Sequence, residues 1–231
     1  MSKDQVVKEL SILIEKRNHH NEIECGKLLA NLEAASVLLP FGASMVLVDA
    51  ELRTSAGDVD LIVCTNESIA GGQTRRRLYV WELKAPQLSL FRIETKGRAS
   101  PTKEFYSAEN QLLQYHAHLA GSEEDRKKYK ITSADDVRIG GIIIGTSRTL
   151  VTNHQGIEKA KAIRLATSAF EIRERTLYRP SSLKLLTWNM VLSSLQAVTI
   201  SHTMFKRPRK ISIPLNAGPE VDEETGTAAE K

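Results

Sequence analysis

The stretches GDVDLIV (residues 57–63) and LYVWELKAP (residues 78–86) decide the fold of this chain. Each is a short apolar run that predicts a buried β-strand, and Pro86 stops the second. The polar segment TNESIAGGQTRRR (residues 65–77) contains two adjacent glycines and predicts an exposed hairpin loop. We therefore expect two adjacent strands connected by this loop.

Four charged residues lie within these apolar strands. Side chains two positions apart point to the same side of a strand, so Asp58 and Asp60 share one face, as do Glu82 and Lys84. Such charges are costly to bury without a partner. Adjacent strands can bring Asp60 beside Glu82, where two carboxylates would hold a hard cation such as Mg2+. Lys84 would then place a positive charge near an attacking water and a phosphoryl group. The alternative is a cross-strand ion pair on a sheet edge.

The spacing of apolar residues on either side of these two strands predicts further helices and strands. Apolar positions at helical spacing indicate helices, and short apolar runs indicate strands. We expect helices over residues 4–38 with a break near 18–21, a strand over 45–52, an irregular polar segment over 88–107 and a helix over 107–119. Further along we expect a strand within 136–146, a helix over 155–178, and a short strand and helix within 182–198. This order predicts a single α/β domain around a mixed central sheet flanked by helices.

Composition fits one globular domain, since 41% of the 231 residues are apolar and 26% are charged. Residues 214–231 hold five acidic residues and one lysine, so this tail carries −4 and the rest of the chain +8. We expect helices in residues 1–40 that pack on a core of residues 41–213, followed by a disordered acidic tail.

Two cysteines, Cys25 and Cys64, exclude a disulfide scaffold and a cysteine zinc site, and they suit a reducing cytoplasm. No segment has the apolar length of a membrane span. The basic body favours a polyanionic partner.

The helix expected over residues 107–119 carries Gln111 and Tyr115, which are four residues apart and therefore share one face. Asp60 followed by Glu82 and Lys84 forms a D…ExK pattern, and in this pattern the chain resembles the PD-(D/E)xK nuclease superfamily. In the exonuclease-like branch of that superfamily, a helix with a QxxxY motif follows the ExK strand, and Gln111 and Tyr115 resemble this motif. More closely, it resembles the Shedu family of prokaryotic antiphage nucleases. That resemblance covers roughly residues 45–195 and rests on WELKAPQLSLF, ENQLLQY, RIGGIIIGTSRTL and LKLLTWNMVL.

The resemblance implies a restriction-endonuclease-like fold and a metal-dependent DNA nuclease that acts in antiviral defence. Asp60 and Glu82 would bind Mg2+ or Mn2+, Lys84 would be the catalytic lysine, and Gln111 and Tyr115 would lie near the substrate phosphates. DNA would be the partner, and no small-molecule cofactor is expected. One departure is Asn189 after Trp188, where the family commonly has an acidic residue; we expect it to affect local capping only.

Further site residues follow from the same resemblance. The first core helix of this superfamily often contributes a glutamate; of Glu22, Glu24 and Glu33, we select Glu24. Asp58 is a supporting partner of the site or a turn cap.

The basic residues Arg75, Arg76 and Arg77 directly precede the ExK strand and are the expected DNA contacts. Such nucleases often act as homo-oligomers, and an interface would use Arg173, Arg175 and Arg179. The rival interpretation is a non-catalytic nucleic-acid-binding or assembly module of the same fold. A protein-interaction scaffold would leave the charged residues in the strands unexplained.

Overall fold

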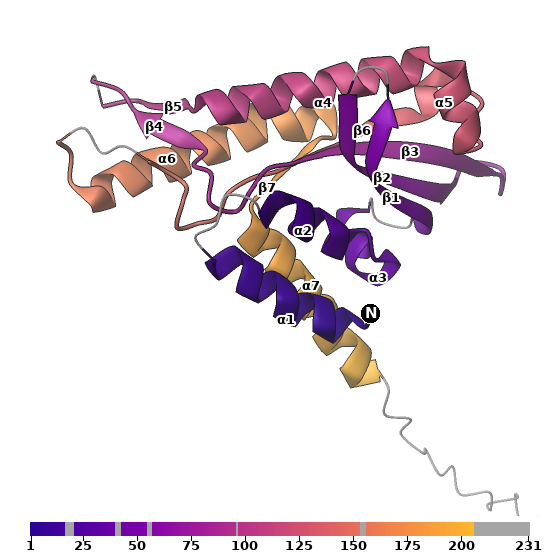
Figure 1. Ribbon diagram of the computed structural model, residues 1–231, viewed down its shortest axis with the longest axis horizontal. Coiled ribbons are helices and arrows are strands. Elements are labelled where there is room, and N and C mark those ends of the chain that lie inside the picture. Colours follow the sequence, from indigo (N-terminus) through magenta and orange to yellow (C-terminus); the bar gives the residue numbers. More distant parts are fainter. Residues whose placement is uncertain (17–20, 40–42, 55–56, 96, 153–155, 206–231) are drawn as a thin grey trace, which may run out of the picture.

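The computed structural model describes residues 1–16, 21–39, 43–54, 57–95, 97–152 and 156–205 (Figure 1). The acidic tail of residues 214–231 and the expected break near residues 18–21 lie largely or wholly outside these ranges. Among the residues described, no helix is both long and apolar enough to cross a lipid bilayer.

A mixed five-stranded sheet forms the centre of the described chain, with the strand order β1-β2-β3-β6-β7. The first two pairings are antiparallel, and the β3–β6 and β6–β7 pairings are parallel. The strands are β1 Ser44–Thr54, β2 Gly57–Ser68, β3 Thr74–Leu83, β6 Val137–Ile143 and β7 Lys184–Leu186. The expected single α/β domain with a mixed central sheet flanked by helices is thus confirmed.

Helices make the connections that parallel pairing requires, because parallel neighbours need a long crossover. Between β3 and β6 the chain forms a small hairpin and two helices: β4 Phe91–Ile93, β5 Ala99–Pro101, α4 Lys103–Gly121 and α5 Glu123–Lys128. A 3-10 turn at Ala134–Asp136 precedes β6. Between β6 and β7 lie α6 Lys159–Arg173, a π-helical turn Glu174–Tyr178 and a 3-10 turn Arg179–Ser181.

The remaining helices come from the two ends of the described chain. These are α1 Lys3–Glu15, α2 Asn21–Leu29, α3 Leu32–Ala35 with a 3-10 turn Ser36–Leu38, and α7 Trp188–Phe205. They lie on the face of the sheet opposite to α4 and α6 (Figure 1).

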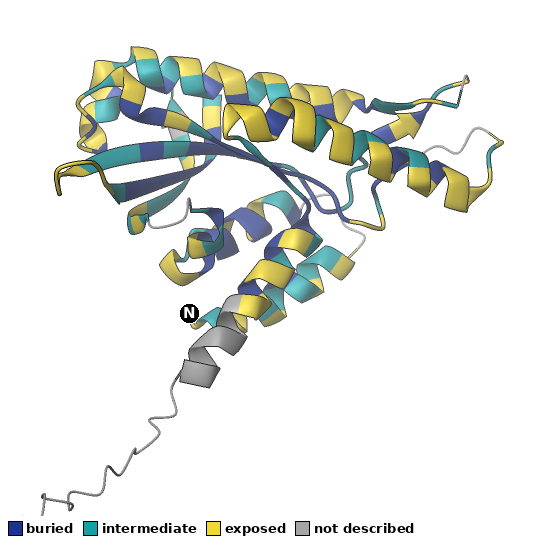
Figure 2. Cartoon of the chain, turned by 180° about the vertical axis from the view of Figure 1, so that it is seen from behind, coloured by how far each residue is buried: buried dark blue, intermediate teal, exposed yellow. Residues whose placement is uncertain are grey.

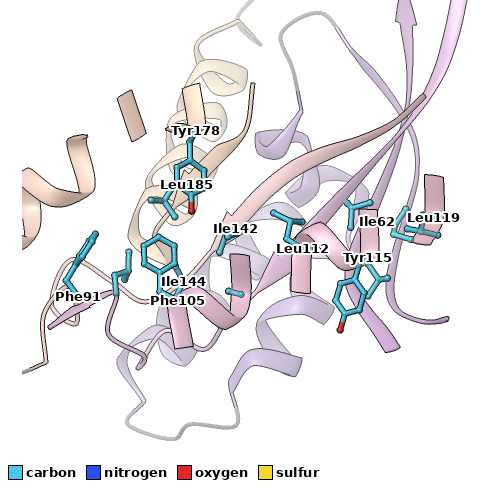
Figure 3. Close-up of a cluster of buried hydrophobic side chains, with 14 of the residues drawn as sticks. Ile62, Phe91, Phe105, Leu112, Tyr115, Leu119, Ile142, Ile144, Tyr178 and Leu185 are labelled. Carbon is cyan, nitrogen blue, oxygen red and sulfur yellow. The ribbon is translucent and has the colours of Figure 1, made fainter. Parts of the chain in front are cut away.

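Each face of the sheet therefore has its own apolar core. Under α4 and α6 the buried cluster includes Phe91, Phe105, Leu112, Ile142 and Tyr178 (Figure 3). The other cluster is formed by α1, α2, α3 and α7 against the sheet and contains Leu10, Leu29, Trp81 and Trp188. Exposed residues mark the outward sides of the covering helices (Figure 2). Burial of apolar area is the main favourable term in folding, so these two cores hold the sheet strands in place.

Two local expectations were wrong. The hairpin loop expected over residues 65–77 is much shorter, because β2 continues to Ser68 and β3 already begins at Thr74. The turn needs a positive φ, which Gly71 and Gly72 supply at 85° and 74°.

The segment 88–107, expected to be irregular, contains the β4–β5 hairpin and the first turn of α4. The Thr102 hydroxyl caps that helix by accepting a hydrogen bond from the Phe105 amide at 3.2 Å.

Close approach of β6 and β7 generates a prediction about Gly141. A Cβ atom at this position would collide with the backbone of Lys184 in β7. We expect Gly141→Ala to lower the free energy of unfolding by about 3 kcal/mol through overpacking. The matched control is Gly121→Ala at the end of α4, where a Cβ meets nothing within 4 Å. That variant should be neutral or up to about 1 kcal/mol more stable. Urea unfolding measures both, and equal midpoints would contradict the close β6–β7 packing.

Candidate active site

Pairing of β2 with β3 brings two carboxylates to the same end of the sheet. The register pairs Leu61 with Trp81, so Asp60 and Glu82 follow as the next facing positions. The Leu83 amide donates a hydrogen bond to Asp60 Oδ2 at 2.8 Å. The structure therefore places Asp60 beside the strand end that carries Glu82.

Lys84 follows directly after β3 and lies between acidic groups. Its Nζ is 2.6 Å from Glu82 Oε1 and 3.8 Å from Glu22 Oε1. Its backbone is held on both sides: the Lys84 amide donates to the Ile143 carbonyl at 2.8 Å, and the Trp188 indole donates to the Lys84 carbonyl at 2.7 Å. The ammonium is thus carried by a segment of chain with little freedom to move.

The glutamate that reaches this cluster from the first helices is Glu22, not Glu24. Glu22 Oε2 accepts a hydrogen bond from the Ala85 amide at 3.0 Å. Glu24 is exposed and lines a groove with Leu13 of α1. Glu22 and Glu24 are two positions apart, which corresponds to about 200° around a helix, so both cannot face the same site. Helical spacing could have predicted this choice, because Glu22 lies one turn before the buried Gly26 and therefore on the same face of α2.

Burial strongly affects the protonation of this cluster. Glu82 is 1% exposed, and burial together with the nearby Asp60 raises its pKa to about 8. Burial also raises the pKa of Asp60, to about 6, although the Leu83 amide opposes the shift. Burial alone would lower the pKa of Lys84, but Glu82 outweighs it and the pKa lies above its usual value. Lys84 therefore remains charged at neutral pH.

Helix α4 brings Tyr115 to the same region. Its ring is buried in the cluster of Figure 3, with its hydroxyl turned away from that cluster. A Cβ on Gly57, at the start of β2, would lie 3.4 Å from this hydroxyl. Burial raises the Tyr115 pKa, and the nearby charges of Glu82 and Asp60 raise it further.

Gln111 lies one turn earlier on α4, and its Oε1 is buried without a hydrogen-bond partner in the described part of the chain. Asp58 is exposed and lies opposite Arg53 in the β1–β2 register. It is near enough to Tyr115 to contribute to the raised pKa of that group.

The arginines expected to bind DNA lie at the opposite end of β3. Arg75 pairs with Asp136, and Arg77 lies 2.5 Å from Glu67. Five to seven strand residues separate Arg75, Arg76 and Arg77 from Glu82, which corresponds to roughly 17–23 Å. These residues belong to β3 and not to the expected loop, so the triplet lies at a distance from the carboxylates. A cavity of about 640 Å³ lies at this distant end beside Arg77, and Asp60, Glu82 and Lys84 do not line it.

The arginines expected at a subunit interface include two that make contacts within the chain. Arg173 lies 2.5 Å from Glu109 of α4 and stacks over the Phe105 ring at 5.3 Å. Arg179 lies 2.7 Å from Glu174. Arg175 lines a shallow hollow beside β7. Arg173 therefore connects α6 to α4 in one copy of the chain.

The carboxylates have the chemistry of a divalent-cation site. Glu82 Oε2 is buried and has no hydrogen-bond partner among the described residues, so one oxygen is free to accept a ligand. Glu22, Asp60 and Leu83 also line a small hollow of about 30 Å³. The described residues contain no group of three or more His, Cys, Asp and Glu arranged to hold a metal ion. Mg2+, however, is commonly bound by one or two carboxylates with water and substrate oxygens, so Asp60 and Glu82 fit it.

Comparison of the chain with protein-family models, with curated proteins and with solved structures finds no match. The case for a function therefore depends on the geometry of Asp60, Glu82, Lys84 and their neighbours.

Proposed function

We propose that this chain is a Mg2+-dependent deoxyribonuclease with a restriction-endonuclease-like fold, of the kind that the Shedu resemblance implies. The single observation that carries the proposal is the cluster of Asp60, Glu82 and Lys84 at the adjoining ends of β2 and β3. Hydrolysis of foreign DNA in a prokaryotic cell would be its role.

Topology supports the same proposal. The two acidic residues come from neighbouring antiparallel strands, and α4 with the QxxxY residues follows before the parallel strand β6. The motifs thus follow one another along the chain in the order that the resemblance implies.

The residues of the site have distinct parts in this proposal. Asp60 and Glu82 would hold Mg2+ or Mn2+, which when bound supplies positive charge to the scissile phosphate and lowers the pKa of water. Lys84 remains protonated and offers hydrogen bonds to the attacking water and to charge that develops on the phosphate.

Gln111 offers its amide, and Tyr115 its hydroxyl, as donors to phosphate oxygens. Glu22 fixes the Ala85 amide and so maintains the backbone that carries Lys84.

The rival explanation, a plain ion pair on a sheet edge, suits this geometry poorly. β3 is an inner strand between β2 and β6, and Glu82 is almost fully buried. Burial of an ion pair yields little net stability after desolvation. A carboxylate that is buried at such cost beside a second carboxylate is better explained by chemistry than by packing.

A non-catalytic module of the same fold is the second candidate, because the 2.6 Å contact of Lys84 with Glu82 also satisfies both groups without a metal.

Substitution of Glu82 and Lys84 distinguishes the nuclease from the non-catalytic module. Glu82→Gln and Lys84→Ala should each reduce Mg2+-dependent cleavage of plasmid DNA by at least about a thousandfold. Lys127→Ala, on exposed α5, is the control and should cleave at the wild-type rate. Cleavage is followed on plasmid, linear duplex and single-stranded DNA with Mg2+ or EDTA, and full activity of either site variant would remove that residue from the mechanism.

Gln111→Ala should slow cleavage by roughly ten- to a thousandfold, the range for loss of one positioned hydrogen-bond donor. The Mg2+ concentration that gives half-maximal rate should change much less, because an uncharged amide contributes little to metal binding. Gln114→Ala is the control on the same helix, since that side chain is exposed. Equal rates for the two variants would show that Gln111 only solvates α4.

Burial of the carboxylates also predicts how stability varies with pH in EDTA. The raised pKa of Glu82 means that the folded state binds more protons than the unfolded state between about pH 4.5 and 8. The free energy of unfolding should therefore fall as pH rises through this window, by on the order of 2 kcal/mol. Glu82→Gln should flatten that dependence, as thermal unfolding at several pH values would show. An equally steep decline in the variant would assign the effect to other groups.

Mg2+ should raise the melting temperature of the wild type at pH 8, since an ion that binds only the folded state stabilises it. Ten millimolar Mg2+ should produce an increase of several degrees in the wild type and a much smaller one in Asp60→Asn. Calorimetry with and without the ion measures this directly. An identical increase in both proteins would place the ion elsewhere.

A further inference from the structure

A prong of the structure extends beyond the ends of β3 and β6. It consists of the β4–β5 hairpin packed against the described residues that follow β6 and the first turns of α6 (Figure 1). The Phe91 amide donates to the Leu150 carbonyl at 2.9 Å, and the Thr152 amide donates to the Phe91 carbonyl at 3.1 Å. Phe91 also forms a parallel bridge with Val151.

This prong is basic. Its described residues, 91–95, 97–104, 147–152 and 156–164, contain three acidic residues, Glu94, Glu104 and Glu158. Against these stand seven basic residues: Arg92, Arg98, Lys103, Arg148, Lys159, Lys161 and Arg164. All seven side chains are exposed.

The basic residues of the prong differ from those at the far end of β3 in their partners. None of the seven makes an ion pair within the described part of the chain, whereas Arg75 and Arg77 are both paired with acidic residues. Lys161 and Arg164 are exposed and three residues apart on α6, so they present two charges on one face of the helix. Unpaired, exposed and clustered cations are available to an external polyanion.

The base of the prong adjoins the candidate active site. Thr149 Oγ1 donates to the Pro86 carbonyl at 3.0 Å, and the Gly145 amide donates to the Ala85 carbonyl at 3.3 Å. Lys84 and Phe91 are seven residues apart, so at most about 25 Å separates them. One turn of B-form DNA is about 34 Å long, so a single duplex can contact both regions.

The connection between prong and site is well fixed. Thr146 and Thr149 bond to each other through their backbone and side chains, with the Thr146 amide 2.7 Å from Thr149 Oγ1. Asn189 Oδ1 accepts from the Ser147 amide at 2.9 Å and so anchors the segment to α7. The charges are therefore presented at a defined position relative to Lys84.

We propose that this basic prong binds the phosphate backbone of duplex DNA and holds it against the active site. The inference rests on the proposed nuclease function and assigns the DNA contacts to the prong in place of Arg75, Arg76 and Arg77. Contacts of lysine and arginine with phosphates supply affinity without reading sequence. The prong thus accounts for binding, and the carboxylates with Lys84 for chemistry.

A matched pair of double variants tests the assignment. Lys161→Ala/Arg164→Ala removes two prong charges, and Lys8→Ala/Lys127→Ala removes two exposed charges from α1 and α5. Both have the same net charge, so a difference between them reports position. Affinity for a fluorescein-labelled duplex of about 30 base pairs is measured in EDTA by anisotropy across a series of salt concentrations. The prong variant should bind at least about tenfold more weakly than the control, and its salt slope should be smaller by roughly two.

Cleavage kinetics in Mg2+ complete the test. The prong variant should show a raised KM with kcat within about twofold of the wild type, because its residues touch DNA and not the scissile phosphate. If the wild type cleaves DNA but the two double variants bind equally well, the prong assignment is overturned and the nuclease proposal stands. If the wild type neither binds nor cleaves duplex DNA, the nuclease proposal itself fails.

Discussion

The contact of Lys84 with Glu82 is the interaction on which the rest of the site depends. One ammonium group compensates a buried carboxylate in the middle strand of the sheet, with Asp60 and Glu22 close by. Without that charge, burial and the nearby Asp60 would raise the pKa of Glu82 still further. The elements around the cluster therefore have to hold the Lys84 ammonium group in one position.

That requirement explains why the supporting contacts are made by backbone groups. Amides of Leu83 and Ala85 bind Asp60 and Glu22, and the Trp188 indole binds the Lys84 carbonyl. The apolar layers on the two sides of the sheet stabilise the domain as a whole, and the polar contacts determine geometry. Stability and chemistry are thus assigned to different residues of the same strands.

Sequence patterns predicted the parts of this structure that depend on local periodicity. The apolar strands, the spacing of Asp60 and Glu82, and the shared face of Gln111 and Tyr115 all follow from residue order. The limits came from effects that residue order does not record. Arg75 and Arg77 look like free loop cations until the cross-strand partners Glu67 and Asp136 are placed beside them.

The same limit applies elsewhere. Glu22 and Glu24 are the same residue type, and they differ only in the direction in which α2 points their side chains. Strands as short as β4 and β5 carry too few residues for a periodic pattern, so the prong had no signature in the sequence. The fold class was therefore accessible from sequence, and the partners of each charge were not.

The hydrogen bond from Trp188 to the Lys84 carbonyl spans 104 positions of the chain, and that from the Ala85 amide to Glu22 spans 63. During synthesis the chain leaves the ribosome from its N-terminus, so the segment that carries Lys84 exists long before its indole partner. The site is consequently among the last features of the domain to be completed. A ribosome-bound chain that stops before Trp188 would contain the acidic residues and the lysine but would lack the indole that holds the Lys84 carbonyl in place.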